Sequence, residues 1–102
     1  MGELNSKNFD AATKSGNVVV DFWGEGCGNC KMMAPFLVSL EAENPNVKFV
    51  KVDTGAATDL VTRFNITTLP TLVFMQNGTV KETLVGLKPR GVLARTIDQL
   101  FK

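Results

Sequence analysis

Short apolar runs, separated by polar and glycine-containing segments, form the main pattern of this chain. The segment 18–23, Val-Val-Val-Asp-Phe-Trp, is apolar except for one Asp, as is typical of a central strand buried on both faces. A second strand is predicted over 47–53. The segments 71–75 and 79–85 flank Asn77-Gly78, a pair that favours the tight turn of a hairpin. The pattern therefore predicts two separate strands followed by an antiparallel pair.

A long helix is predicted between the first two strands. Within 27–43 the apolar residues Met33, Leu37 and Leu40 recur at helical spacing. Pro35 falls inside this pattern and cannot donate a backbone hydrogen bond, so we expect a kink there. A strand, a helix and a second strand in this order form a βαβ unit, which implies that the two strands are parallel.

Shorter helices complete the predicted fold. The first should run from Ser6, as its N-cap, to about Gly16, where glycine suits a left-handed cap. Another is expected over 56–64, and Pro89 suits the first turn of a last helix. The apolar face of that last helix is formed by Leu93, Ile97, Leu100 and Phe101. The order α, β, α, β, α, β, β, α predicts one α/β domain over residues 1–102, with a mixed sheet covered by helices.

Composition and charge narrow the classes of function. The chain has 102 residues, enough for one domain with a real core. Its 11 basic and 10 acidic residues give no electrostatic argument for a nucleic acid or an anionic membrane as partner. No stretch approaches the ~18 apolar residues of a membrane span, and no secretory signal is visible, so a cytoplasmic location is expected. The absence of His excludes Cys/His catalysis, and two Cys are too few for a usual zinc site within one chain.

Both cysteines lie between the first strand and the long helix, spaced C-x-x-C as Cys27 and Cys30. Residues at this spacing are neighbours at the start of a helix, and a disulfide needs Cα atoms within roughly 4.4–6.8 Å. A disulfide that closes so short a loop stabilises little, so the pair is predicted to open and close reversibly. The positive end of the helix dipole favours a thiolate at Cys27, which would attack a substrate disulfide, while Cys30 resolves the mixed disulfide. The alternatives are two ordinary core cysteines or half of an intermolecular metal site.

Asp21 interrupts the apolar strand two residues before Trp23. A buried, unpaired carboxylate is expensive, so its affinity for protons should be raised. Such a group is suited to take the proton from Cys30 when that thiol attacks. Lys51 in the neighbouring strand is a candidate partner for it. The alternatives are a structural ion pair or a register that points Asp21 to solvent.

These motifs together resemble the thioredoxin family over nearly the full chain. The matching segments, in family order, are 21–23, 31–35, 51–53, 69–72, Asn77-Gly78 and Gly86. The resemblance implies a central mixed sheet flanked by helices on both faces, with a cis peptide bond before Pro70 facing the dithiol. It also implies that the backbone of Leu69 pairs with an extended substrate segment. The substrate-binding residues implied in this way are Trp23, Gly24, Gly26, Leu69, Pro70, Gly86 and Leu87.

The function implied by this resemblance is reduction of protein disulfides. An external reductase would supply the electrons, no cofactor beyond the Cys27–Cys30 disulfide would be needed, and the chain would act as a monomer. The sequence departs from the family where Gly26 replaces the usual Trp and Asn29 the usual Pro. In the resulting Cys-Gly-Asn-Cys site, Gly28 and Asn29 are expected to tune the redox potential, because Asn29 adds polar groups beside the thiols. The alternatives are a more oxidising oxidase or isomerase, a binding module without enzymatic activity, and one half of a dimeric zinc site.

Overall fold

The computed structural model describes all of residues 1–102 and contains a five-stranded sheet with four helices. Every predicted helix and strand is present, and one short strand at the N-terminus is additional. The elements are β1 (Gly2–Leu4), α1 (Phe9–Thr13), β2 (Asn17–Trp23), α2 (Gly28–Glu43), β3 (Val47–Asp53), α3 (Thr58–Arg63), β4 (Thr71–Gln76), β5 (Thr79–Val85) and α4 (Arg90–Phe101).

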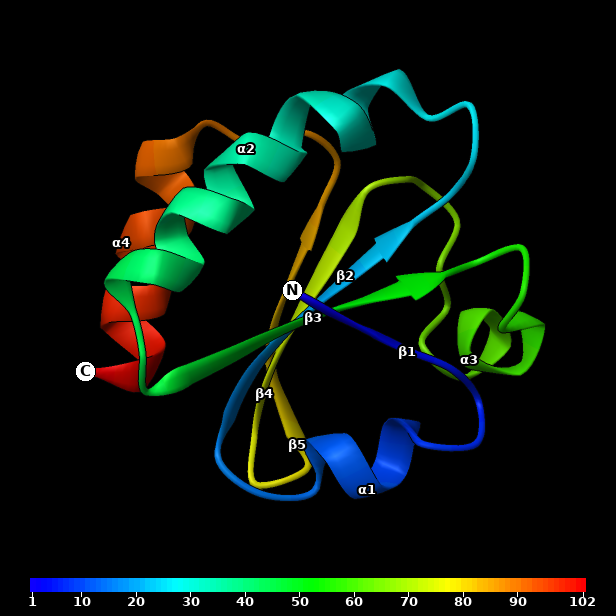
Figure 1. Cartoon of the computed structure of the whole chain (residues 1–102), viewed down its shortest axis with the longest axis horizontal. Helices are drawn as coiled ribbons and strands as arrows, with labels where there is room; N and C mark the ends of the chain where they lie inside the picture. The colour runs from blue at the N-terminus through cyan, green and yellow to red at the C-terminus, as the bar shows by residue number, and fades with distance from the viewer.

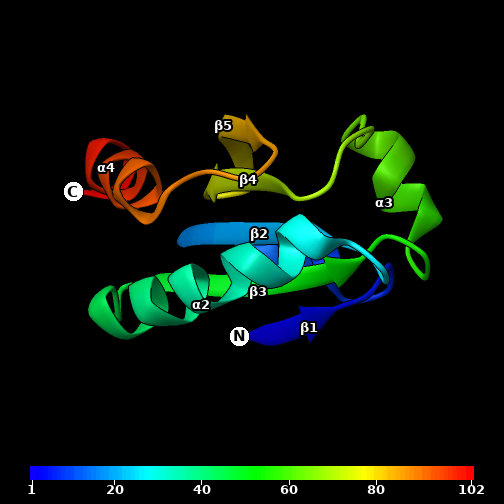
Figure 2. The ribbon, with the colours of Figure 1, turned by 90° about the horizontal axis from the view of Figure 1, so that it is seen from above.

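The sheet is mixed, as predicted, with the strand order β1-β3-β2-β4-β5 (Figure 2). Strands β1, β3 and β2 are parallel, whereas β4 is antiparallel to both β2 and β5. Asn77 and Gly78 form the turn of the hairpin with positive φ angles of 50° and 81°, which is the conformation of a type I′ turn. Strands β2 and β3 of the βαβ unit therefore lie inside the sheet, with β2 as its central strand.

Helices cover both faces of this sheet, with α2 and α4 on one side and α1 and α3 on the other (Figure 1). Residues of β2 alternate between the two cores, so that Val18, Val20 and Phe22 pack towards α1 and α3. Val19 packs instead against α2 and α4. Because side chains alternate along a strand, Asp21 shares the face of Val19 and lies on the same side of the sheet as α2.

The N-terminal segment differs from the prediction in two respects. Ser6 does not cap α1, because the helix begins at Phe9 with Asn8 as its N-cap, and the Ser6 hydroxyl donates to the carboxylate of Asp59 instead. The additional strand β1 pairs with β3 at the sheet edge. Its three residues are too few for a periodic pattern to be recognised. Helix α2 continues through Pro35, and the kink expected there stays a prediction.

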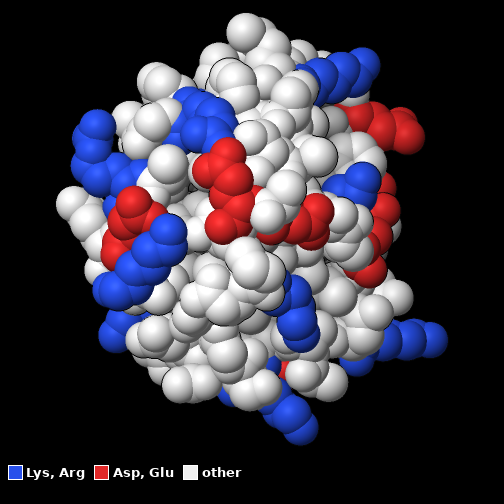
Figure 3. Space-filling view, turned by 60° about the vertical axis from the view of Figure 1, so that its left-hand side comes forward, with Lys and Arg blue, Asp and Glu red and all other residues white.

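Charged side chains are mixed on the surface. On the face shown in Figure 3, Lys and Arg lie among Asp and Glu, and neither sign forms a continuous patch. This distribution agrees with a formal net charge of +1. None of the helices has both the length and the apolar character needed to cross a bilayer.

Candidate functional site

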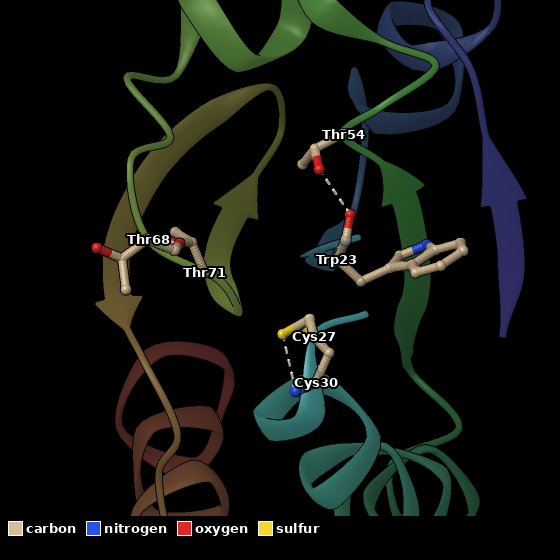
Figure 4. Close-up of a disulfide and its surroundings, with 6 residues drawn as sticks. All are labelled: Trp23, Cys27, Cys30, Thr54, Thr68 and Thr71. Carbon is tan, nitrogen blue, oxygen red and sulfur yellow. Dashed lines mark hydrogen bonds between the residues drawn. A yellow bond between two sulfur atoms is a disulfide. The ribbon is translucent and has the colours of Figure 1, made fainter. Parts of the chain in front are cut away.

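The two cysteines form a disulfide at the N-terminus of α2 (Figure 4). Cys27 is the N-cap residue, and its sulfur accepts a hydrogen bond of 3.1 Å from the backbone amide of Cys30. The Cα atoms are 5.3 Å apart, within the range that a disulfide requires. After reduction, the same amide and the positive end of the helix dipole stabilise a thiolate at Cys27.

The two sulfurs differ in accessibility. Cys30 is only 8% exposed, whereas Cys27 is half-buried and opens to solvent. A large incoming disulfide therefore reaches Cys27 more readily than Cys30. This asymmetry supports the predicted division between an attacking and a resolving cysteine, because only the attacking sulfur must meet a second protein.

A cavity of about 470 Å³ lies beside the disulfide. It brings together residues from β2, β3, α2 and the loop that joins β2 to α2. Its lining comprises Asp21, Trp23, Gly24, Glu25, Gly26, Cys27, Cys30, Lys31, Ala34 and Lys51. The two predicted redox cysteines thus share one cavity with the predicted proton acceptor and its candidate partner. No group of three or more His, Cys, Asp or Glu side chains is arranged to hold a metal ion.

Asp21 is buried in the wall of this cavity and is only 6% exposed. The alternative register, in which Asp21 points to solvent, is therefore wrong. Its Oδ1 atom has no hydrogen-bond partner. Burial raises the pKa of Asp21 from its ordinary value of 3.8 to about 6, while the positive charge of Lys51 acts in the opposite direction. A carboxyl with a pKa near neutrality exchanges protons readily at physiological pH.

Lys51 lies directly opposite Asp21 in the register of β2 and β3. The alternative of a structural ion pair between them is not seen, since Lys51 takes part in none of the four ion pairs of the structure. The Lys51 ammonium lies instead 5.5 Å from the centre of the Trp23 ring. Lys51 therefore acts on Asp21 through space, and the carboxyl keeps a raised pKa.

Of the predicted substrate-binding residues, Trp23, Gly24 and Gly26 line the cavity beside the disulfide, whereas Leu69, Pro70, Gly86 and Leu87 lie outside it. The Leu69–Pro70 peptide bond is cis, as the family resemblance implied, and the amide of Gly86 donates to the carbonyl of Pro70 at 2.7 Å. In Figure 4 the disulfide lies between Trp23 and the segment from Thr68 to Thr71. A second cavity of about 530 Å³ is lined by residues of three loops and by the last residue of β3, namely Gly24, Glu25, Asp53, Thr54, Gly55, Ala56 and Leu69.

The remaining loop residues lie at the surface. Gly26 is exposed and has a φ of +76°, a conformation that side chains rarely adopt, so this position suits glycine. Gly28 and Asn29, between the cysteines, are both exposed, and Leu87 is 36% exposed. Gly86 and Leu87 do not line the cavity that holds Asp21 and Lys51. The candidate residues thus form two groups, one on each side of the disulfide.

Gly24 is expected to tolerate no side chain without movement of Leu69. A Cβ atom added at Gly24 would lie 2.8 Å from Cδ1 of Leu69 and 3.1 Å from Oγ1 of Thr54. We expect Gly24→Ala to lower the free energy of unfolding by about 1 kcal/mol, measured by urea unfolding of the oxidised protein. Gly91→Ala is the control, because a Cβ there meets open space in α4 and should stabilise the helix by about 0.5–1 kcal/mol. A Gly24→Ala protein as stable as the parent would contradict the close contact.

Glu3 is the site residue that the sequence did not indicate. The indole Nε1 of Trp23 donates a hydrogen bond of 3.0 Å to Oε2 of Glu3. The backbone carbonyl of Trp23 accepts a second hydrogen bond, of 2.9 Å, from the hydroxyl of Thr54. Glu3 belongs to the unpredicted strand β1, so no pattern in the sequence placed it near the dithiol.

Comparison with known sequences agrees with this geometry. The sequence model of the family described as Thioredoxin matches residues 1–99. A thioredoxin of Bacillus subtilis is 36% identical over 95% of this chain and 94% of its own length. Thioredoxin C-3 of Corynebacterium nephridii is 38% identical over 95% of this chain and 68% of its own length.

Solved structures show the same fold. Mitochondrial thioredoxin 3 from Saccharomyces cerevisiae, in its oxidised form, superposes with a TM-score of 0.91 at 31% identity, covering 98% of this chain and 95% of that one. Plasmodium falciparum thioredoxin superposes with a TM-score of 0.91 at 29% identity, covering 98% and 99%. The predicted thioredoxin fold is thereby confirmed. With a C-x-x-C disulfide at the start of α2, the chain belongs to the thioredoxin family and is a thiol-disulfide oxidoreductase.

Proposed function

We propose that this chain reduces protein disulfides, with Cys27 as the attacking and Cys30 as the resolving cysteine. The observation that carries this assignment is the asymmetry of the pair. Cys27 caps α2, accepts the amide hydrogen bond of Cys30 and is accessible, whereas Cys30 is buried against a cavity that contains Asp21. A stabilised and accessible thiolate is the form of cysteine that attacks disulfides.

The proposed reaction has two exchange steps. The Cys27 thiolate attacks one sulfur of the substrate disulfide, and the other substrate sulfur leaves as a thiolate. Cys30 then loses its proton to Asp21 and attacks Cys27, which releases the second substrate sulfur and restores the Cys27–Cys30 disulfide. Asp21 suits this role because its raised pKa lies close to neutral pH. Lys51 keeps that pKa from rising further, since its charge favours the carboxylate.

The substrate is proposed to bind as an extended segment beside Leu69. Strand addition of this kind uses free backbone groups for affinity. The amide of Gly86 donates to the carbonyl of Pro70, which ties this loop to the residue that follows β5. Trp23, Gly24, Gly26 and Leu87 would complete the contact surface. Gly28 and Asn29 are proposed to tune the redox potential, because both lie between the thiols at the surface.

An external reductase is the proposed electron donor, so that the chain takes part in electron transport. Thioredoxins act on protein disulfides and are reduced by such an enzyme, and this chain matches thioredoxins over most of its length. We further propose that it acts as a single-domain monomer in the cytoplasm. The reaction as written needs no cofactor beyond the Cys27–Cys30 disulfide.

The proposed function is tested by an insulin reduction assay together with a redox titration against glutathione. We expect catalysed reduction of insulin with dithiothreitol as donor, and a two-electron titration with a potential of about −270 mV. Protein with both thiols alkylated is the control and should be inactive. A potential between about −120 and −180 mV would identify an oxidase or isomerase instead. An inert protein that purifies with bound zinc would contradict the redox function altogether.

A further inference from the structure

Three charged residues form a row across three adjacent strands of the sheet. Glu3 of β1 is paired in register with Lys51 of β3, and Lys51 is paired in register with Asp21 of β2. Residues paired in this way point to the same face of a sheet. Lys51 therefore lies between two carboxyl groups, one exposed at the sheet edge and one buried beside the disulfide.

The indole of Trp23 connects the members of this row. Its Nε1 donates to Oε2 of Glu3 at 3.0 Å, and the ammonium of Lys51 lies 5.5 Å from the centre of the ring. Figure 4 shows the indole pointing away from the disulfide and towards β3. Because a cation within about 6 Å of an indole is attracted to its face, the ring that Glu3 holds also holds the Lys51 ammonium.

We propose that Glu3 is a positioning residue of the dithiol site, which fixes the Trp23 ring and shares the charge of Lys51 with Asp21. Glu3 touches neither a sulfur nor a substrate in this arrangement. It acts through Lys51 and Trp23 on the proton affinity of Asp21. Any effect of Glu3 on the rate of disulfide reduction rests on the proposed function of Asp21 as proton acceptor. Its effect on the proton affinity of Asp21 does not rest on that function.

The direction of the effect follows from the charges around Asp21. The charged and titratable groups that share its cavity are Lys51 from β3, Lys31, Cys27 and Cys30 from the start of α2, and Glu25 from the preceding loop. Removing the negative charge of Glu3 removes a repulsion on the Asp21 carboxylate. Asp21 then experiences the charge of Lys51 without the opposing charge of Glu3. The change favours the carboxylate and therefore lowers the pKa of Asp21.

The expected size of this effect is small but measurable. Adjacent strands are about 4.8 Å apart, so Glu3 lies two strands, or about 10 Å, from Asp21. This distance is comparable with a Debye length of about 10 Å at 0.1 M salt. With a dielectric constant close to that of water, one unscreened charge at about 10 Å shifts the pKa by about 0.3, and screening at 0.1 M salt reduces this shift to about 0.1. The titration is therefore made at about 0.01 M salt, where the Debye length is about 30 Å.

The experiment is a direct titration of Asp21 in the oxidised protein, followed by the carboxyl ¹³C shift in NMR. Glu3→Gln keeps an oxygen that accepts from the indole but removes the charge, and we expect it to lower the pKa of Asp21 by about 0.3. Glu43→Gln is the matched control, because Glu43 ends α2, about 22 Å from its first residue, and its ion pair with Arg90 is exposed. The proposal is overturned if Glu3→Gln leaves the pKa unchanged, or if Glu43→Gln shifts it equally.

A second variant tests the hydrogen bond alone. Glu3→Leu removes the acceptor, so exchange of the indole Nε1 proton with solvent should become faster than in the parent protein, whereas Glu3→Gln should exchange at about the rate of the parent. Equal exchange in all three proteins would show that Glu3 does not hold the ring. Because the pKa is read without any substrate, failure of this proposal is separable from failure of the Asp21 mechanism, which is tested by the kinetics of Asp21→Asn.

Discussion

Replacement of Cys27 by Ser is expected to abolish catalysed disulfide reduction, with a rate lower by a factor on the order of a thousand or more. A serine hydroxyl does not ionise near neutral pH, so the amide of Cys30 and the dipole of α2 would have no thiolate to stabilise. Cys30 cannot take over the attack because it is only 8% exposed. The measurement is the initial rate of insulin reduction, compared with the parent protein at equal concentration.

The matched control is Cys30→Ser, which removes the same disulfide but leaves Cys27 in place. It should also fail to turn over, yet it should form a mixed disulfide with substrate through Cys27, detected as a covalent adduct by mass spectrometry. Cys27→Ser should form no such adduct at a comparable rate. If Cys27→Ser instead gave the faster adduct through Cys30, the assignment of attacking and resolving cysteine would be reversed. Cellular proteins that form the same mixed disulfide with Cys27 of Cys30→Ser would be candidate physiological partners.

The sequence was sufficient for those parts of the site that depend on local motifs. The C-x-x-C spacing after an apolar strand placed both sulfurs at the start of α2, since the strand and the helix are each encoded by their own periodicity. The burial of Asp21 followed from its apolar neighbours in the same strand. The cis bond before Pro70 followed only from the family resemblance, because few bonds that precede proline are cis.

The parts that the sequence did not predict depend on pairing between distant strands. Strand β1 has three residues, two of them exposed, and is stabilised by its ladder with β3 rather than by its own pattern. Without that ladder, Glu3 could not be placed beside Lys51 or Trp23. Lys51, the candidate partner of Asp21, makes no ion pair with it for a related reason. Register brings their backbones together, but the Trp23 ring offers the Lys51 ammonium another contact.

Replacement of Asp21 by Asn is expected to slow the resolution of a mixed disulfide by roughly a hundredfold at pH 7, the usual contribution of a positioned general base. An amide cannot accept the proton of Cys30, while the shape of the cavity wall is kept. The rate of the parent protein should rise with pH through about 6, the pKa of Asp21, and the variant should lack this inflection. The measurement is single-turnover release of a labelled substrate from Cys27 across pH 5–8. Equal rates in both proteins would exclude Asp21 as proton acceptor.

Asp21→Asn should also change how the free energy of unfolding of the oxidised protein depends on pH. The folded protein holds the Asp21 proton more tightly than the unfolded chain, because burial raises its pKa from 3.8 to about 6. Protonation of Asp21 therefore contributes about 3 kcal/mol of stability at low pH, which is lost as the pH rises through this window, and Asp21→Asn lacks this contribution. The difference in unfolding free energy, variant minus parent, should increase by that amount between pH 3.5 and 8 in urea unfolding. Asp98→Asn, a control in α4 that loses only an exposed ion pair with Lys102, should show no comparable change. A difference that is constant with pH would mean that Asp21 is ionised in the folded protein as readily as in the unfolded chain.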